Sequence, residues 1–206
     1  MAKLGTKENP FPDSAAAKKA GKLWQGTAAV KKMQDLLGRD LTSTEEKIVK
    51  KEGYVDGYYK DSLKVVTRGV GQTGDYADGS QSHTGFVQAI NDATKSAENQ
   101  SQIMTDAGRS VDPNFTESLV GVNYQLGGGW TEKFPSAWGN LQSGDYEGAI
   151  SQIQFADPNA ADPVKSNWAL QTPVRVDAFT QAIRNQAGYK KAPKNAPGVN
   201  SYEQYM

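Results

Sequence analysis

Apolar side chains recur at helical spacing through the second half of the chain. Phe86, Ile90, Ala93 and Ala97 stand at positions i, i+4, i+7 and i+11, which predicts a long amphipathic helix beginning near Thr84. Similar spacing predicts helices over residues 115–126, 134–141 and 146–153. The pair Thr172-Pro173 adds a helix start, because threonine caps and proline fits the first turn, so a last helix is expected to about Gln186.

The pattern is different between residues 42 and 71. Two overlapping capping boxes, Thr42 with Glu45 and Ser43 with Glu46, predict a short helix that ends at Gly53. Two β-prone runs follow, over residues 54–61 and 64–68, separated by a polar turn, and they predict a small antiparallel sheet. The fold class expected from the whole pattern is α+β, with a small sheet-bearing lobe followed by a helical lobe.

The two ends of the chain carry weaker signals. A stripe of apolar residues from Ala16 to Leu37 predicts one helix, although Gly21 and Gly26 weaken it by about 1 kcal/mol each relative to alanine. That helix can pack on its own domain or dock on a partner, and the pattern alone leaves both open. Residues 187–206 are rich in Pro, Lys and Asn near their start and predict an extended tail.

Composition excludes several classes of protein. The 206 residues contain 23 basic and 23 acidic side chains, no Cys and a single His, so disulfides, thiol catalysis and a zinc site are not expected, and no metal or other cofactor is. Zero net charge argues against nucleic-acid binding. No apolar run approaches the ~20 residues of a membrane helix, and the N-terminus lacks the apolar core of a secretory signal.

The zero net charge is a sum of unlike parts. Residues 1–40 carry eight basic and four acidic residues (+4), residues 187–206 carry three and one (+2), and residues 41–186 carry 12 and 18 (−6). The charge distribution therefore predicts an acidic body with two basic ends.

Three residues of the sheet region have side chains suited to acid–base chemistry. Glu52 stands at the end of the predicted helix, Asp61 in the hairpin and Thr67 on its second strand. Inverting glycoside hydrolysis needs one carboxylic acid to protonate the leaving oxygen and one carboxylate to activate water, and a hydroxyl can hold that water. The spacing alone has little specificity, because exposed charges on a small lobe produce it as well.

The stretch from Glu52 to Gly71 resembles the active-site segment of the T4-type phage lysozymes, glycoside hydrolase family 24. That family has Glu, eight residues, Asp, five residues, Thr and then Gly-x-Gly, all present here without a gap. A second segment, Trp168 to Arg175 with its Gln-Thr-Pro-Val-Arg, resembles the family's sequence at the start of its last helix, and residues 123–127 resemble the end of its central helix. The resemblance spans about residues 42–186, which implies a lysozyme-like catalytic domain over 42–186, an N-terminal extension over 1–41 and a C-terminal tail over 187–206.

The resemblance implies a lysozyme-like fold with the cleft between the two lobes, and a role for each matching residue. Glu52 would be the general acid, Asp61 the carboxylate that activates water and Thr67 the residue that positions that water, while Arg175 would pair with the acid. The sugar-binding positions would be Gly71, Thr73, Tyr124 and Gln152.

The chain departs from the family at a few positions. Gln72 stands where the family usually has His, and Ala137 where a cleft Ser is expected. The segment between Ile153 and Trp168 is longer than in the family, and its two Pro and two Asp residues predict a surface loop. His83 is expected at a helix start, and Trp138 in the core.

The function implied is a phage muramidase that cleaves the β-1,4 bond between N-acetylmuramic acid and N-acetylglucosamine. Peptidoglycan is then the substrate, and the basic ends, 1–41 and 187–206, are expected to bind other virion proteins. Such an enzyme is carried in the phage particle and acts in the host periplasm or cell wall. The alternatives are an endolysin that waits in the host cytoplasm for a holin, a structural virion protein with a weakly active or inactive lysozyme-like domain, and, as a minor option, a bacterial toxin of similar fold.

Overall fold

The computed structural model describes residues 3–78 and 83–186 of the chain. The chain divides into two compact units, Met1–Asp92 and Ala93–Met206, and helix α4 (Thr84–Asp106) contributes residues to both. The predicted C-terminal tail, 187–206, lies outside the described residues, and the predicted boundary after residue 41 stays a prediction.

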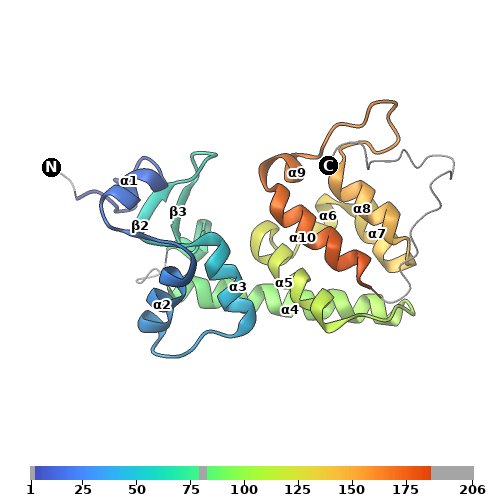
Figure 1. Ribbon diagram of the computed structural model, residues 1–206, viewed down its shortest axis with the longest axis horizontal. Helices are drawn as coiled ribbons and strands as arrows, with labels where there is room; N and C mark the ends of the chain where they lie inside the picture. The colour runs from blue at the N-terminus through green and yellow to red at the C-terminus, as the bar shows by residue number, and fades with distance from the viewer. Residues whose placement is uncertain (1–2, 79–82, 187–206) are drawn as a thin grey trace. The chain divides into compact units, whose positions relative to one another are not determined.

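The first unit combines helices with a small antiparallel sheet in the strand order β1-β2-β3 (Figure 1). Its elements before α4 are α1 (Ser14–Lys19), β1 (Leu23–Trp24), α2 (Gly26–Leu37), α3 (Ser43–Glu52), β2 (Tyr54–Lys60), β3 (Val66–Gly69) and the 3-10 helix η1 (Gly74–Ala77). The predicted helix before Gly53, the predicted hairpin and the α+β class are therefore confirmed.

The prediction of one helix from Ala16 to Leu37 is wrong. The chain forms α1, turns at Gly21 with φ +67°, and pairs Leu23 and Trp24 with β2 before α2 begins. Glycine is a poor helix former, and two of them within six residues let the chain extend. The apolar Leu23 and Trp24 then pack as a third strand, which a helical reading of the stripe misses.

Helix α3 begins at the capping box of Thr42 with Glu45, and not at the overlapping box predicted for Ser43 with Glu46. The Thr42 side chain accepts a hydrogen bond from the N–H of Glu45, and the Glu45 carboxylate accepts one from the N–H of Thr42. Ser43 is already the first helical residue, and Glu46 instead forms an ion pair with Lys50 one turn later. Two caps cannot start one helix, and the upstream one, which holds a buried carboxylate, prevails.

Gly53 ends α3 and joins it to β2 in a conformation that only glycine adopts readily. Its φ is +74°, and a Cβ there would lie 2.8 Å from the carbonyl oxygen of Trp24. The close approach of β1 to the start of β2 therefore depends on the missing side chain.

The second unit is helical in its described residues. Its elements after α4 are α5 (Pro113–Leu126), α6 (Trp130–Lys133), α7 (Pro135–Ser143), α8 (Tyr146–Gln154), α9 (Asn167–Gln171) and α10 (Pro173–Arg184). The five helices predicted from the apolar spacing and the Thr172-Pro173 signal are confirmed, and α6 and α9 are short additions. Residues 155–166 form the predicted loop, with Phe155 and Lys165 bridged at its base.

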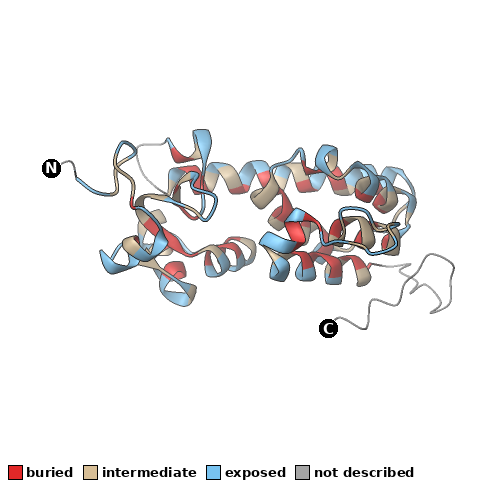
Figure 2. Ribbon diagram, turned by 90° about the horizontal axis from the view of Figure 1, so that it is seen from above, coloured by how far each residue is buried: buried red, intermediate tan, exposed pale blue. Residues whose placement is uncertain are grey.

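The core of this unit is aromatic and contains a hydrogen-bonded pair of buried amide side chains, Gln100 and Asn123. Trp130 is fully buried and meets Phe179 edge-on, with ring centroids 5.9 Å apart, and Phe115 stacks on Phe179 at 5.8 Å. In Figure 2 buried residues (red) and exposed residues (pale blue) alternate along the helices. In the described part of the chain, no helix is long and apolar enough to cross a membrane.

Candidate functional site

Glu52 is the last residue of α3 and is half-buried. Its Oε2 lies 3.8 Å from the point where a Cβ would stand on Gly71, in the turn that follows β3. Capping of α3 at Thr42 and its sharp end at Gly53 set the position of this carboxylate, so the helix carries Glu52 to the end of the sheet.

Asp61 directly follows β2 and organises the hairpin turn. Its Oδ1 accepts hydrogen bonds from the backbone N–H groups of Leu63, at 2.8 Å, and Val65, at 2.9 Å. The Asp61 N–H also donates to the Val65 carbonyl at 3.0 Å. An aspartate that caps its own turn in this way has a fixed orientation, which general-base chemistry requires.

Thr67 lies on β3 and is 3% exposed. Its hydroxyl donates to the Val65 carbonyl at 3.1 Å. A hydroxyl oxygen that donates its proton in this direction keeps lone pairs that can accept a hydrogen from another group. The Val65 carbonyl thus accepts hydrogen bonds from both the Thr67 hydroxyl and the Asp61 N–H.

Tyr59 connects these residues, and the sequence reasoning missed it. It pairs with Thr67 across the sheet, and paired residues project from the same face. Burial, followed by the negative charges of Glu52 and Asp61, raises the pKa of the Tyr59 phenol to about 12. Both carboxylates are thus within electrostatic reach of one phenol. The i, i+2 spacing of Tyr59 and Asp61 was the available signal, since alternate strand residues share a face.

The turn after β3 is closed by Gln72. Its side chain accepts from the Val70 N–H at 2.8 Å and donates to the Val70 carbonyl at 2.9 Å, and its backbone pairs with Arg68 in both directions. Gln72 is buried. Gly71, at φ +81°, and Thr73 are exposed beside it, and Thr73 is the residue before η1.

The remaining predicted residues belong to the second unit. Tyr124 lies in the last turn of α5, Gln152 near the end of α8 and Arg175 in the first turn of α10, and all three are half-buried. Glu52, Asp61, Thr67, Gly71 and Thr73 thus lie around β2 and β3 in the first unit, whereas Tyr124, Gln152 and Arg175 lie on helices of the second.

A polar network links the helix ends that carry Tyr124 and Arg175. The Gln125 side chain donates to the Thr172 hydroxyl at 3.0 Å and accepts from Trp168 Nε1 at 3.3 Å. The Thr172 hydroxyl donates in turn to the Trp168 carbonyl at 3.2 Å. Thr172 precedes α10 but makes no capping bond with its side chain, because Gln125 and Trp168 occupy it.

No family model and no curated protein sequence matches the chain. The candidate site therefore stands on its local motifs and on the contacts described above.

Other candidate residues have structural positions. His83 directly precedes α4, as expected, and Ala137 is fully buried on α7. Trp138 is half-buried and packs edge-on against Trp130 at 5.9 Å. Among residues 3–78 and 83–186, no group of three or more His, Asp or Glu side chains is placed to hold a metal ion.

Proposed function

We propose that the chain is a peptidoglycan muramidase that cleaves the β-1,4 bond between N-acetylmuramic acid and N-acetylglucosamine. One observation carries the proposal: the half-buried phenol of Tyr59, whose strand partner is Thr67, lies within electrostatic reach of both Glu52 and Asp61. Glu52 precedes β2, Asp61 follows it and Thr67 lies on the neighbouring β3, so the proposed acid, base and water-holding hydroxyl border the β2–β3 hairpin.

The proposed reaction is hydrolysis with inversion. Glu52 donates its proton to the glycosidic oxygen, which leaves as the hydroxyl of the released sugar. A water held by Asp61 and Thr67 attacks the anomeric carbon from the opposite face, and Asp61 takes the proton that this water loses. Separate carboxylates for acid and base are the requirement of this mechanism.

Each first-unit residue has an environment that suits this role. Asp61 is oriented through Oδ1 by two backbone N–H groups, so the turn supports its carboxylate without a cation. Thr67 donates to Val65, which directs its lone pairs away from that carbonyl. Tyr59, with its pKa of about 12, stays neutral at physiological pH and adds no third negative charge between the two carboxylates.

We assign the second unit a substrate-binding role on the strength of the motifs. Arg175 is proposed to pair with the general acid, and Tyr124 and Gln152 to contact sugar together with Gly71 and Thr73. The network of Gln125, Thr172 and Trp168 supports this assignment, because it fixes the start of the helix that carries Arg175.

Replacement of Glu52 by glutamine tests the function. Purified Glu52→Gln protein is expected to lose clearing of a bacterial cell-wall suspension while its circular dichroism spectrum and thermal unfolding stay unchanged. Glu46→Gln is the matched control, because Glu46 lies on the same helix and forms an ion pair with Lys50 one turn away. Products of the wild-type enzyme should carry N-acetylmuramic acid at the new reducing end, as read by mass spectrometry. A Glu52→Gln protein that still clears walls would overturn the assignment.

We further propose that the enzyme is carried in the phage particle and opens the wall at infection. The support is charge: residues 1–40 contribute +4 while residues 41–186 sum to −6, and the exposed Lys18, Lys19 and Lys31 offer basic groups to other virion proteins. Mass spectrometry of purified particles tests this, and particles without the chain would instead favour an endolysin. Wild-type protein that is abundant in particles and fails to clear walls would favour a structural virion component.

A further inference from the structure

An N-terminal segment runs along the outer edge of β2, the strand that leads to Asp61. We call residues 5–24 the N-terminal brace. Its backbone hydrogen bonds to β2 join Tyr58 N–H to Gly5 O (2.9 Å), Phe11 N–H to Tyr58 O (2.8 Å), Lys60 N–H to Phe11 O (3.0 Å) and Asp56 N–H to Lys22 O (2.8 Å). The brace therefore satisfies the backbone of an edge that would otherwise be open.

Phe11 is the anchor of the brace. It is 4% exposed and forms an apolar cluster with Ala17 and Val55, against which Tyr59 packs. Phe11 and Tyr59 form a parallel bridge, so their side chains project from the same face. A Cβ on Gly57 would lie 3.4 Å from Cε2 of Phe11 and 3.0 Å from the Gly5 carbonyl oxygen, so the glycine makes room for the brace.

Three side chains thus stand in one row across neighbouring segments. Phe11 of the brace is bridged to Tyr59 of β2, and Tyr59 is paired with Thr67 of β3. Tyr59 is held between an apolar anchor on one side and the candidate water-holding residue on the other. Because interiors are close-packed, a space opened beside Tyr59 is transmitted to its neighbours.

We propose that Phe11 is a positioning residue of the candidate site, which acts through Tyr59 to fix the strand that carries Asp61 and its alignment with Thr67. This inference rests on the proposed muramidase function, and it makes the N-terminal brace part of the catalytic sheet. Loss of the Phe11 ring leaves a void beside Tyr59, so the phenol gains freedom and water reaches it. Misplacement of reacting groups by about 1 Å can lower a rate about 100-fold.

The test compares three purified full-length variants with wild type. Phe11→Ala removes the anchor, Phe11→Leu restores most of its bulk, and Met33→Ala is the control, because it deletes another fully buried side chain of the same unit on α2. Kinetics are measured with soluble peptidoglycan fragments at a temperature at which circular dichroism shows all proteins folded. Tyrosine ionisation is followed by ultraviolet titration, with Tyr59→Phe identifying the contribution of Tyr59.

We expect Phe11→Ala to change both the catalytic rate and the titration of Tyr59. Phe11→Ala lowers kcat about tenfold with KM unchanged, Phe11→Leu recovers most of the loss, and Met33→Ala keeps the wild-type kcat. In Phe11→Ala the pKa of Tyr59 falls from about 12 toward the ordinary value near 10, since water replaces the ring.

Two results would overturn the inference: Phe11→Ala with wild-type kcat and Tyr59 titration, or equal losses in Phe11→Ala and Met33→Ala. Wild-type protein without hydrolysis defeats the proposed function itself, and the tyrosine titration then still decides whether Phe11 fixes Tyr59.

Discussion

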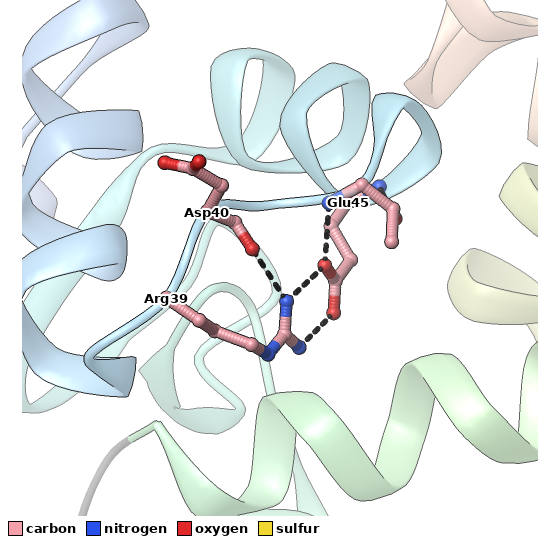
Figure 3. A network of polar contacts seen from close by, with 4 residues as sticks. Arg39, Asp40 and Glu45 are labelled. Carbon is pink, nitrogen blue, oxygen red and sulfur yellow. Dashed lines mark hydrogen bonds and ion pairs between the residues drawn. The ribbon is translucent and has the colours of Figure 1, made fainter.

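Arg39 and Glu45 form a two-pronged ion pair at the start of the helix that carries Glu52. Arg39 Nη1 lies 2.8 Å from Glu45 Oε2, and Nη2 lies 2.7 Å from Oε1 (Figure 3). The same Oε2 accepts the capping hydrogen bond from the Thr42 N–H, and Arg39 Nη1 also donates to the Asp40 carbonyl. The Glu45 side chain is almost fully buried, while that of Arg39 is 44% exposed. One carboxylate thus caps α3 and ties it to the segment before it.

This ion pair predicts a specific dependence of stability on pH. The hydrogen bond from Arg39 is the largest cause that lowers the pKa of Glu45, and burial opposes it. A lowered folded-state pKa stabilises the fold above the unfolded value near 4.5, and that stability is lost as pH falls through the folded pKa. We expect Arg39→Ala to lower the free energy of unfolding by about 1–3 kcal/mol at pH 7, discounted for the exposure of Arg39.

The comparison of Arg39→Ala with Glu45→Gln separates the charge from the cap, because glutamine can still serve in a capping box. Both variants should unfold in denaturant with a flatter pH profile below about pH 5 than wild type. A wild-type steepness in either variant would show that the pair contributes nothing to acid unfolding.

Two substitutions of Asp61 are expected to differ in their effect on stability while both reduce activity. In Asp61→Asn the side-chain oxygen can still accept from Leu63 and Val65, so the melting temperature should stay close to that of wild type while wall-clearing activity falls at least about 100-fold. Asp61→Ala loses both hydrogen bonds as well and should cost about 1–2 kcal/mol of stability. Ser62→Ala, at the exposed neighbouring position, should change neither quantity. An active Asp61→Asn enzyme would remove Asp61 from the mechanism.

Gly53 should tolerate substitution far less than a glycine with similar φ and open surroundings. Gly53 (φ +74°) would place a Cβ 2.8 Å from the Trp24 carbonyl oxygen, whereas Gly38 (φ +65°) has nothing within 4 Å of that point. We expect Gly38→Ala to cost about 1 kcal/mol, the usual penalty for left-handed backbone, and Gly53→Ala about 3 kcal/mol or more. Thermal unfolding of the two variants measures the difference, and equal losses would mean that β1 moves away without cost.

The sequence predicted the elements whose signals are local and missed the contacts that join distant segments. Helix α3 was correctly bounded because Thr42, Glu45 and Gly53 all lie within or next to it. Strand β1 was missed because Leu23 and Trp24 also fit a helical stripe, and only their pairing with Val55 and Tyr54 makes them a strand.

In the candidate site, too, the sequence predicted the local motif and missed the contacts between distant segments. The motif identified Glu52, Asp61 and Thr67 by their spacing, but the influence of both carboxylates on Tyr59 depends on strand register and on burial. Phe11 was visible only as an aromatic residue between two prolines in an extended segment, and nothing local in the sequence says which strand it joins. Register and edge pairing are long-range properties, so one sequence does not fix them.

The buried amides of Gln100 and Asn123 are expected to depend on each other. Each donates to the other, at 3.1 and 3.0 Å, and Gln100 also binds Trp130 Nε1 and the Gly128 carbonyl, both at 3.3 Å. Gln100→Leu leaves a buried Asn123 amide without this partner and should cost about 2–3 kcal/mol. The double variant Gln100→Leu/Asn123→Leu should lose less than the sum of the single losses, because two leucines leave no orphaned amide between α4 and α5. Gln102→Leu, on the exposed face of α4, is the control for the leucine itself. Chemical denaturation of wild type, the two single variants and the double variant gives the coupling energy. Strictly additive losses would mean that the two amides stabilise the unit independently.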